Sequence, residues 1–186
     1  GREELREVAA AIRSGWITMG PRTVEFERRF KEYLASRSGL PAASLQAVAV
    51  NSATAALHLA LKAIGLRAGD EVLLPTNTFV ATAEVCTYFG AIPVLCDVEE
   101  DTHNLAVSEL AKRVTKRTRA IIPVHFAGQP CDMDEILDFA RRRGLPVIED
   151  AAHALPSTYK GRMVGTLGDI TCYSFYGTKT LAMGEG

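Results

Sequence analysis

The carboxyl-terminal part of the chain contains three groups that could together hold a reactive aldehyde cofactor. Lys179 offers an amine that can form a Schiff base, and Ser174 offers a hydroxyl that can donate to a phosphate, with a Gly-Glu-Gly turn just after them. Asp150 offers a carboxylate that could keep a pyridine nitrogen protonated. These are the needs of pyridoxal phosphate (PLP), whose ring acts as an electron sink. The alternative for Lys179 is an ordinary surface lysine.

A second segment could bind the phosphate of such a cofactor. A short apolar strand, expected at 47–50, runs into a polar turn and then a helix that Ser52 or Thr54 can cap. The free amides and positive end of a helix dipole attract anions, and small residues let a phosphate approach the backbone. In the plainer interpretation, Asn51 and Ser52 only cap the helix.

A third segment, 73–82, offers an aromatic ring beyond the end of a strand. An apolar run ends there in Pro75, followed by Thr and Asn residues and another helical pattern. Ligands of parallel sheets collect beyond the carboxyl ends of the strands, so the ring of Phe79 could lie flat on a planar cofactor. The alternative is that Phe79 packs in the core.

Taken in order, nine segments of the chain resemble the sugar aminotransferases of the DegT/StrS type, which are fold-type-I PLP enzymes. The segments are 14–21, 51–56, 69–72, 75–82, 90–94, 123–130, 149–153, 165–169 and 174–186. The resemblance covers nearly the whole chain and implies the large PLP-binding domain of an aspartate aminotransferase-like fold. It also implies a homodimer whose two chains share the active sites.

The same resemblance implies a role for each candidate residue. Lys179 would be the Schiff-base lysine and proton shuttle, and Asp150 the partner of the protonated pyridine nitrogen. Phe79 would stack on the ring, and His153 would lie close to the 3-hydroxyl of the ring. The phosphate would be held by Ser52, Ala53, Thr54 and Ser174.

The reaction implied by the resemblance is the transfer of an amino group from glutamate to a keto group of a nucleotide-linked sugar, in deoxysugar and polysaccharide biosynthesis. The matched segments do not specify the nucleotide, the sugar or the ring carbon. We expect Trp16, Thr18, Met19 and Tyr176 near the sugar, because the apolar loop around Trp16 needs a ligand or a neighbour to cover it. Alternatively, these residues pack the dimer.

Composition restricts the other classes of partner. The chain has 186 residues, 47% hydrophobic, and a net charge of −1, so it can bury a sizeable core but has no bias toward nucleic acids or anionic membranes. Without a run of about 18 apolar residues or a signal-peptide pattern, we expect a cytoplasmic protein. The scattered cysteines and histidines lack metal-ligand spacing, so we expect reduced, mostly buried thiols and no metal site.

Apolar runs of strand length alternate with helical patterns along the chain. Strands are expected at 47–50, 71–74, 92–97, 120–124, 145–149 and 170–175, and helices at 3–14, 21–34, 53–64, 79–89, 108–113 and 133–143. This alternation is typical of an α/β three-layer sandwich, with a mainly parallel sheet covered on both faces. We expect residues 1–186 to form the PLP-binding large domain, incomplete and without the small C-terminal domain that follows in relatives.

Two other classes remain as alternatives. A nicotinamide-binding domain would need a glycine-rich turn after its first strand and an acid about twenty residues later, but the turn from Asn51 to Thr54 has no glycine. A PLP-binding regulatory or non-catalytic protein of the same fold would need neither a proton shuttle nor an electron sink. The presence of both Lys179 and Asp150 therefore favours the enzyme.

Overall fold

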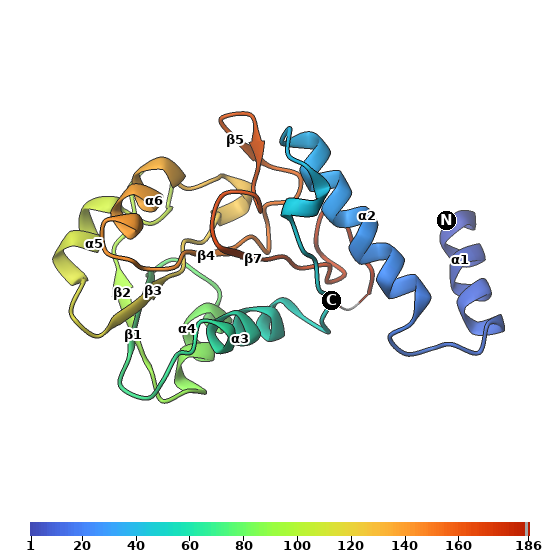
Figure 1. Cartoon of the computed structure of the whole chain (residues 1–186), viewed down its shortest axis with the longest axis horizontal. Coiled ribbons are helices and arrows are strands. Elements are labelled where there is room, and N and C mark those ends of the chain that lie inside the picture. Colours follow the sequence, from blue (N-terminus) through green and yellow to red (C-terminus); the bar gives the residue numbers. More distant parts are fainter. Residues whose placement is uncertain (185) are drawn as a thin grey trace. The chain divides into compact units, whose positions relative to one another are not determined.

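The computed structural model describes residues 1–184 and 186, which form two compact units, Gly1–Ala49 and Val50–Gly186 (Figure 1). The first unit is helical, with α1 (Arg2–Arg13), α2 (Pro21–Arg37) and the short 3₁₀-helix η1 (Ala42–Ser44). Pro21 begins α2, at a position where its missing N–H has no partner to lose. Both predicted helices are confirmed, although α2 continues beyond the predicted end at residue 34.

The predicted strand at 47–50 is wrong. A strand exists only where a neighbour completes its hydrogen bonds, and no ladder involving these residues is present in the described part of the chain. The amide of Ala49 instead donates to the Glu27 carboxylate, at 2.7 Å. Val48 is 76% exposed, which shows that an apolar run alone does not place a segment in the core.

The second unit contains a parallel sheet. Its strands are β1 (Glu71–Pro75), β2 (Ile92–Cys96), β3 (Thr118–Ile121), β4 (Ile148–Asp150) and β7 (Ile170–Cys172). β1 pairs with β2 and β3, β4 pairs with β7, and single parallel bridges from Ile121 to Val147 and from Val124 to Asp150 join the two groups. The order is therefore β2-β1-β3-β4-β7, and all carboxyl ends lie along one edge.

Helices cover both faces of this sheet (Figure 1). They are α3 (Ala53–Ala63), α4 (Val80–Thr87), α5 (Val107–Arg113) and α6 (Met133–Arg141). Side chains of β1 alternate between the faces: Val72 and Leu74 pack with α3 and α4, and Leu73 packs with α5 and α6. The predicted α/β three-layer sandwich is confirmed.

A small antiparallel hairpin was not predicted. It pairs β5 (Thr158–Tyr159) with β6 (Arg162–Met163) through Lys160 and Gly161, which both have positive φ. Two-residue strands are too short to show an alternating pattern, so only the turn could have indicated the hairpin. Another short element, the 3₁₀-helix η2 (Phe126–Gly128), follows β3.

No helix within the described residues is long and apolar enough to cross a membrane.

Candidate active site

Asp150 ends β4 at the carboxyl edge of the sheet and is only 5% exposed. Its Oδ2 accepts a hydrogen bond from the Thr82 hydroxyl at 2.7 Å, and its Oδ1 accepts one from the Ala152 amide at 3.2 Å. The Thr82 hydroxyl also lies 2.7 Å from that of Thr78. The first turn of α4 therefore orients a buried carboxylate.

The two threonines were not predicted as site residues from the sequence. Thr78 and Thr82 are spaced i, i+4 at the start of a helix that follows a strand end, which places both hydroxyls on one side. Thr82 is fully buried, so its hydroxyl needs a partner. That spacing was the available signal, but the identity of the partner depends on the packing of α4 against the sheet.

Phe79 is the N-cap residue of α4, one turn before Thr82, and its carbonyl accepts the Thr82 amide at 3.1 Å. The residue is 74% exposed. Packing of Phe79 in the core is thus contradicted for this chain. Its ring is accessible at the same edge of the sheet as Asp150, where a planar ligand could lie against it.

Lys179 is half-buried in a turn after β7, where its amide donates to the Tyr176 carbonyl at 2.8 Å. Desolvation and the positive charge of Lys179 hold the pKa of His153 below its usual value, whereas the negative charge of Asp150 acts in the opposite direction. Glu185, in the predicted turn after Lys179, lies outside the described residues.

The start of α3 can bind an anion. Ser52 is its N-cap, as predicted, and accepts the Ala55 amide at 3.1 Å. The amides of Ala53 and Thr54 are in the first turn, where a helix provides no acceptor of its own. α3 packs against β4 and β7 and ends shortly before the amino end of β1, so its own start points toward the carboxyl edge of the sheet.

Ser174 follows the last residues of β7 on the same edge. Its hydroxyl lies 3.5 Å from the carbonyl of Gly186 and 3.4 Å from the amide of Tyr176. Both contacts are long, so this hydroxyl remains able to donate to a phosphate. Tyr176 itself is exposed.

Trp16, Thr18 and Met19 belong to the first unit. The Trp16 indole donates to the Met19 carbonyl at 2.7 Å and closes the loop before α2, and the side chains of Trp16 and Met19 are exposed. An ideal Cβ at Gly20 would collide with the indole, so this loop conformation requires glycine there. A place for these residues near a sugar stays a prediction.

The chemistry of these groups fits PLP. An amine, an oriented carboxylate, an accessible aromatic face and a helix amino end all lie in the second unit, at the carboxyl edge of its sheet. The four cysteines are free and buried, as predicted, and burial raises the pKa of Cys131 to about 12, so that thiol stays protonated. Within the described residues, no group of three or more His, Cys, Asp or Glu side chains could hold a metal ion.

The parallel sheet with helices on both faces is the fold of the fold-type-I PLP-dependent enzymes. Residues 1–186 match the sequence profile of the DegT/DnrJ/EryC1/StrS aminotransferase family, and the chain belongs to that family. The resemblance inferred from the sequence is therefore confirmed.

Three relatives illustrate the similarity. The spore coat polysaccharide biosynthesis protein SpsC of Bacillus subtilis is 50% identical over 186 residues, which are 100% of this chain and 46% of SpsC. The GDP-perosamine synthase of Caulobacter vibrioides is 48% identical over 172 residues, which are 92% of this chain and 44% of that enzyme. The solved PLP-form of Spr1654 from Streptococcus pneumoniae is 36% identical with a TM-score of 0.91, covering 100% of this chain and 49% of that one.

The chain thus spans about half the length of the relatives it matches. The predicted cofactor agrees with the PLP-form of the structural relative. The roles of individual residues at the edge of the sheet remain predictions.

Proposed function

We propose that this protein is a PLP-dependent aminotransferase that moves an amino group from glutamate to a keto group of a nucleotide-linked sugar. The observation that carries the proposal is the buried Asp150 carboxylate, which Thr82 orients at the carboxyl edge of the sheet, where the ring of Phe79 is accessible. Membership of the aminotransferase family supports the reaction class.

Each group would have a distinct task. PLP, when bound, supplies an electron sink for the charge that develops when a C–H bond breaks. Asp150 would hold a proton on the pyridine nitrogen, and Lys179 would bind the aldehyde and later move a proton through Nζ. The ring of Phe79 would support the cofactor face, and His153 would lie near the 3-hydroxyl. The phosphate would accept hydrogen bonds from Ser52, Ala53, Thr54 and Ser174.

The names of the relatives support a sugar substrate. One relative is a GDP-perosamine synthase and another acts in spore coat polysaccharide biosynthesis, which agrees with a nucleotide-linked sugar and with a role in deoxysugar or polysaccharide pathways. Trp16, Thr18, Met19 and Tyr176 stay our candidates for contacts with that sugar. A cytoplasmic location also stays a prediction.

The test is to incubate the full-length protein with PLP, glutamate and a panel of nucleotide-linked 3-keto and 4-keto sugars. We expect an aminated sugar and continuing release of 2-oxoglutarate with at least one keto sugar. Without a keto sugar, no aminated sugar should form and 2-oxoglutarate should not exceed one equivalent per bound PLP, because the amino group then stays on the cofactor. Bleaching of the cofactor band by glutamate without turnover of any keto sugar would contradict the proposal that the amino acceptor is a nucleotide-linked keto sugar. A stable cofactor band that glutamate does not bleach would instead identify a non-catalytic PLP protein.

We also propose that the protein works as a homodimer with shared active sites. Leu5, Val8 and Ile12 form an exposed apolar face on α1, and Trp16 is exposed in the following loop. A twofold contact would cover both copies of such surfaces at once.

Sedimentation of the PLP-bound protein is expected to give twice the chain mass, and Trp16→Ala is expected to weaken association, sugar binding or both. A stable monomer that turns over glutamate would contradict the dimer.

A further inference from the structure

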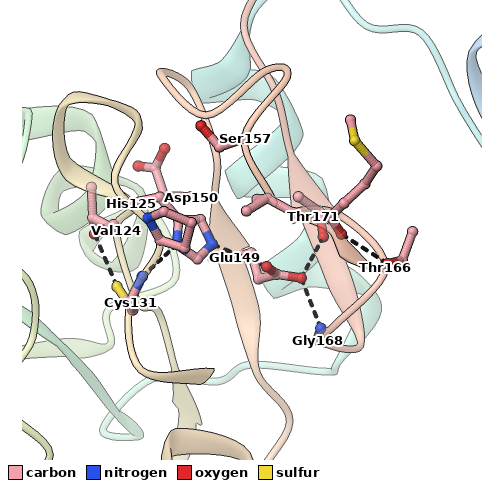
Figure 2. Close-up of polar contacts among 12 residues, drawn as sticks. Val124, His125, Cys131, Glu149, Asp150, Ser157, Thr166, Gly168 and Thr171 are labelled. Carbon is pink, nitrogen blue, oxygen red and sulfur yellow. Dashed lines mark hydrogen bonds and ion pairs between the residues drawn. The ribbon is translucent and has the colours of Figure 1, made fainter. Parts of the chain in front are cut away.

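Glu149, the residue before Asp150 on β4, is a second buried carboxylate, and the proposed reaction does not use it. The side chains of Glu149 and its partner His125 are both 0% exposed. One oxygen of Glu149 lies 3.0 Å from His125 Nε2, and the other accepts the Gly168 amide at 2.7 Å and the Thr171 hydroxyl at 2.9 Å. Figure 2 shows the carboxylate held between His125 on one side and Gly168 and Thr171 on the other.

The protons of this network can be assigned from its geometry. The Cys131 amide donates to His125 Nδ1 at 3.1 Å, so the imidazole carries its proton on Nε2 and donates it to Glu149. Burial acts to raise the pKa of Glu149, but its interaction with His125 and the hydrogen bonds from Gly168 and Thr171 hold that pKa below its usual value. Glu149 is therefore a buried anion whose two carboxylate oxygens both accept hydrogen bonds.

Segments of the same network lie on both sides of the Asp150 backbone. On one side, the Asp150 amide donates to the Pro123 carbonyl at 2.9 Å, and the His125 amide donates to the Asp150 carbonyl at 3.1 Å. On the other side, the Ala151 amide donates to the Cys172 carbonyl at 2.9 Å. The two segments that flank Asp150 thus each carry a side chain, His125 or Thr171, that is hydrogen-bonded to the Glu149 carboxylate.

Gly168 shows how closely the chain approaches this carboxylate. An ideal Cβ at Gly168 would lie 2.9 Å from the Val147 carbonyl oxygen and 3.2 Å from Glu149 Oε1. A side chain there would push the loop away and remove the amide from Glu149. The loop is therefore shaped around the buried anion.

We propose that Glu149 and His125 are positioning residues, which fix the Asp150 carboxylate where it holds a proton on the pyridine nitrogen of PLP. This inference rests on the proposed function. The network acts through geometry, because it joins the strands on both sides of Asp150, and through charge, because a buried anion favours a proton on a nearby base. Cys172 is the β7 partner of Asp150, directly after Thr171, which donates to Glu149 at 2.9 Å, so both carboxylates face the same part of β7.

Glu149→Gln tests the network because glutamine keeps the shape but cannot satisfy every partner. If its NH₂ group faces His125, the imidazole must present a lone pair on Nε2 and place its proton on Nδ1, where the Cys131 amide already donates. If it faces Gly168, two donors meet there. The first arrangement displaces the segment of His125, which is bonded to Asp150, and the second displaces the loop that leads into β7.

Glu71→Gln is the matched control. Glu71 is 3% exposed in the same sheet and is bonded to the Thr115 hydroxyl at 2.5 Å and to Arg117 at 2.5 Å. It begins β1, at the amino end of the strand, and so lies at the opposite edge from Asp150. It reports what the loss of a buried carboxylate does to stability alone.

The measurements are the ¹⁵N NMR signal of holoenzyme loaded with ring-¹⁵N PLP, kcat and KM of the glutamate half-reaction, and Tm. For Glu149→Gln we expect the ¹⁵N signal to move toward the unprotonated position and kcat to fall about 10- to 100-fold, by analogy with the hydrogen-bonded partners of metal ligands, with little change in KM. Glu71→Gln should lower Tm but keep the wild-type signal and kcat. His125→Gln, which retains a donor toward Glu149, should stay closer to wild type than His125→Leu.

A lowered Tm for Glu149→Gln with an unmoved ¹⁵N signal and an unchanged kcat would overturn the inference and leave a structural pair only. Should that variant fail to fold, the two His125 variants decide the question by the same signal, and equal signals in both would overturn it. Absence of a bound-PLP signal in the wild-type protein would overturn the proposed function itself.

Discussion

Replacing Lys179 with alanine is expected to abolish the borohydride-trappable pyridoxyl adduct and transamination together. The amine that binds the aldehyde and moves the proton is lost, and a general acid-base group alone contributes about 10²–10⁴-fold to a rate. The fold should remain, because the turn at this position is held by the backbone bond from the Lys179 amide to Tyr176, which alanine keeps.

The adduct is measured by reducing the PLP-bound protein with borohydride and locating the pyridoxyl group by peptide mass spectrometry. Lys62→Ala is the control, since Lys62 is an exposed lysine in the last turn of α3 and should leave both adduct and activity unchanged. A pyridoxyl group on any other lysine of the wild-type protein would show that the assignment of Lys179 is wrong.

The strands and helices that position the site were predictable because burial on both faces leaves a local pattern. β1 reads as a continuous apolar run since Val72 and Leu73 face opposite helical layers. The segment at 47–50 has the same local pattern but pairs with no other strand among the described residues, and a pairing strand is not visible in a local pattern. The number and order of paired strands therefore had to come from the structure.

The candidate site likewise contains some residues whose position was predictable from the sequence and others whose contacts were not. The positions of Asp150 and Phe79 at one edge of the sheet were predictable because each lies at or just past the end of a strand, and the ends of parallel strands share one edge. The role of Thr82 and the contact between His125 and Glu149 were not predictable, because they depend on which side of a helix or strand packs inward. An acid within an otherwise apolar strand was the only sign that Glu149 would need buried partners.

Asp150→Asn is expected to keep PLP bound but slow the glutamate half-reaction by roughly 10²–10³-fold, the range for loss of one preorganised electrostatic group. An uncharged side chain cannot hold the proton on the pyridine nitrogen, so the chain loses its means of keeping the ring electron-poor. The measurement is single-turnover bleaching of the cofactor band by glutamate, with PLP occupancy determined separately.

The fold tolerates this change for a structural reason. The asparagine oxygen can still accept the Ala152 amide, and its NH₂ group can donate to the Thr82 hydroxyl, which then donates to Thr78 instead. Asp169→Asn is the matched control, because Asp169 accepts the Val147 amide at 2.8 Å at the opposite end of β4 and β7 and should change stability without changing the rate. A near wild-type rate in Asp150→Asn would make Asp150 a structural carboxylate, held by Thr82 only to join α4 to the sheet.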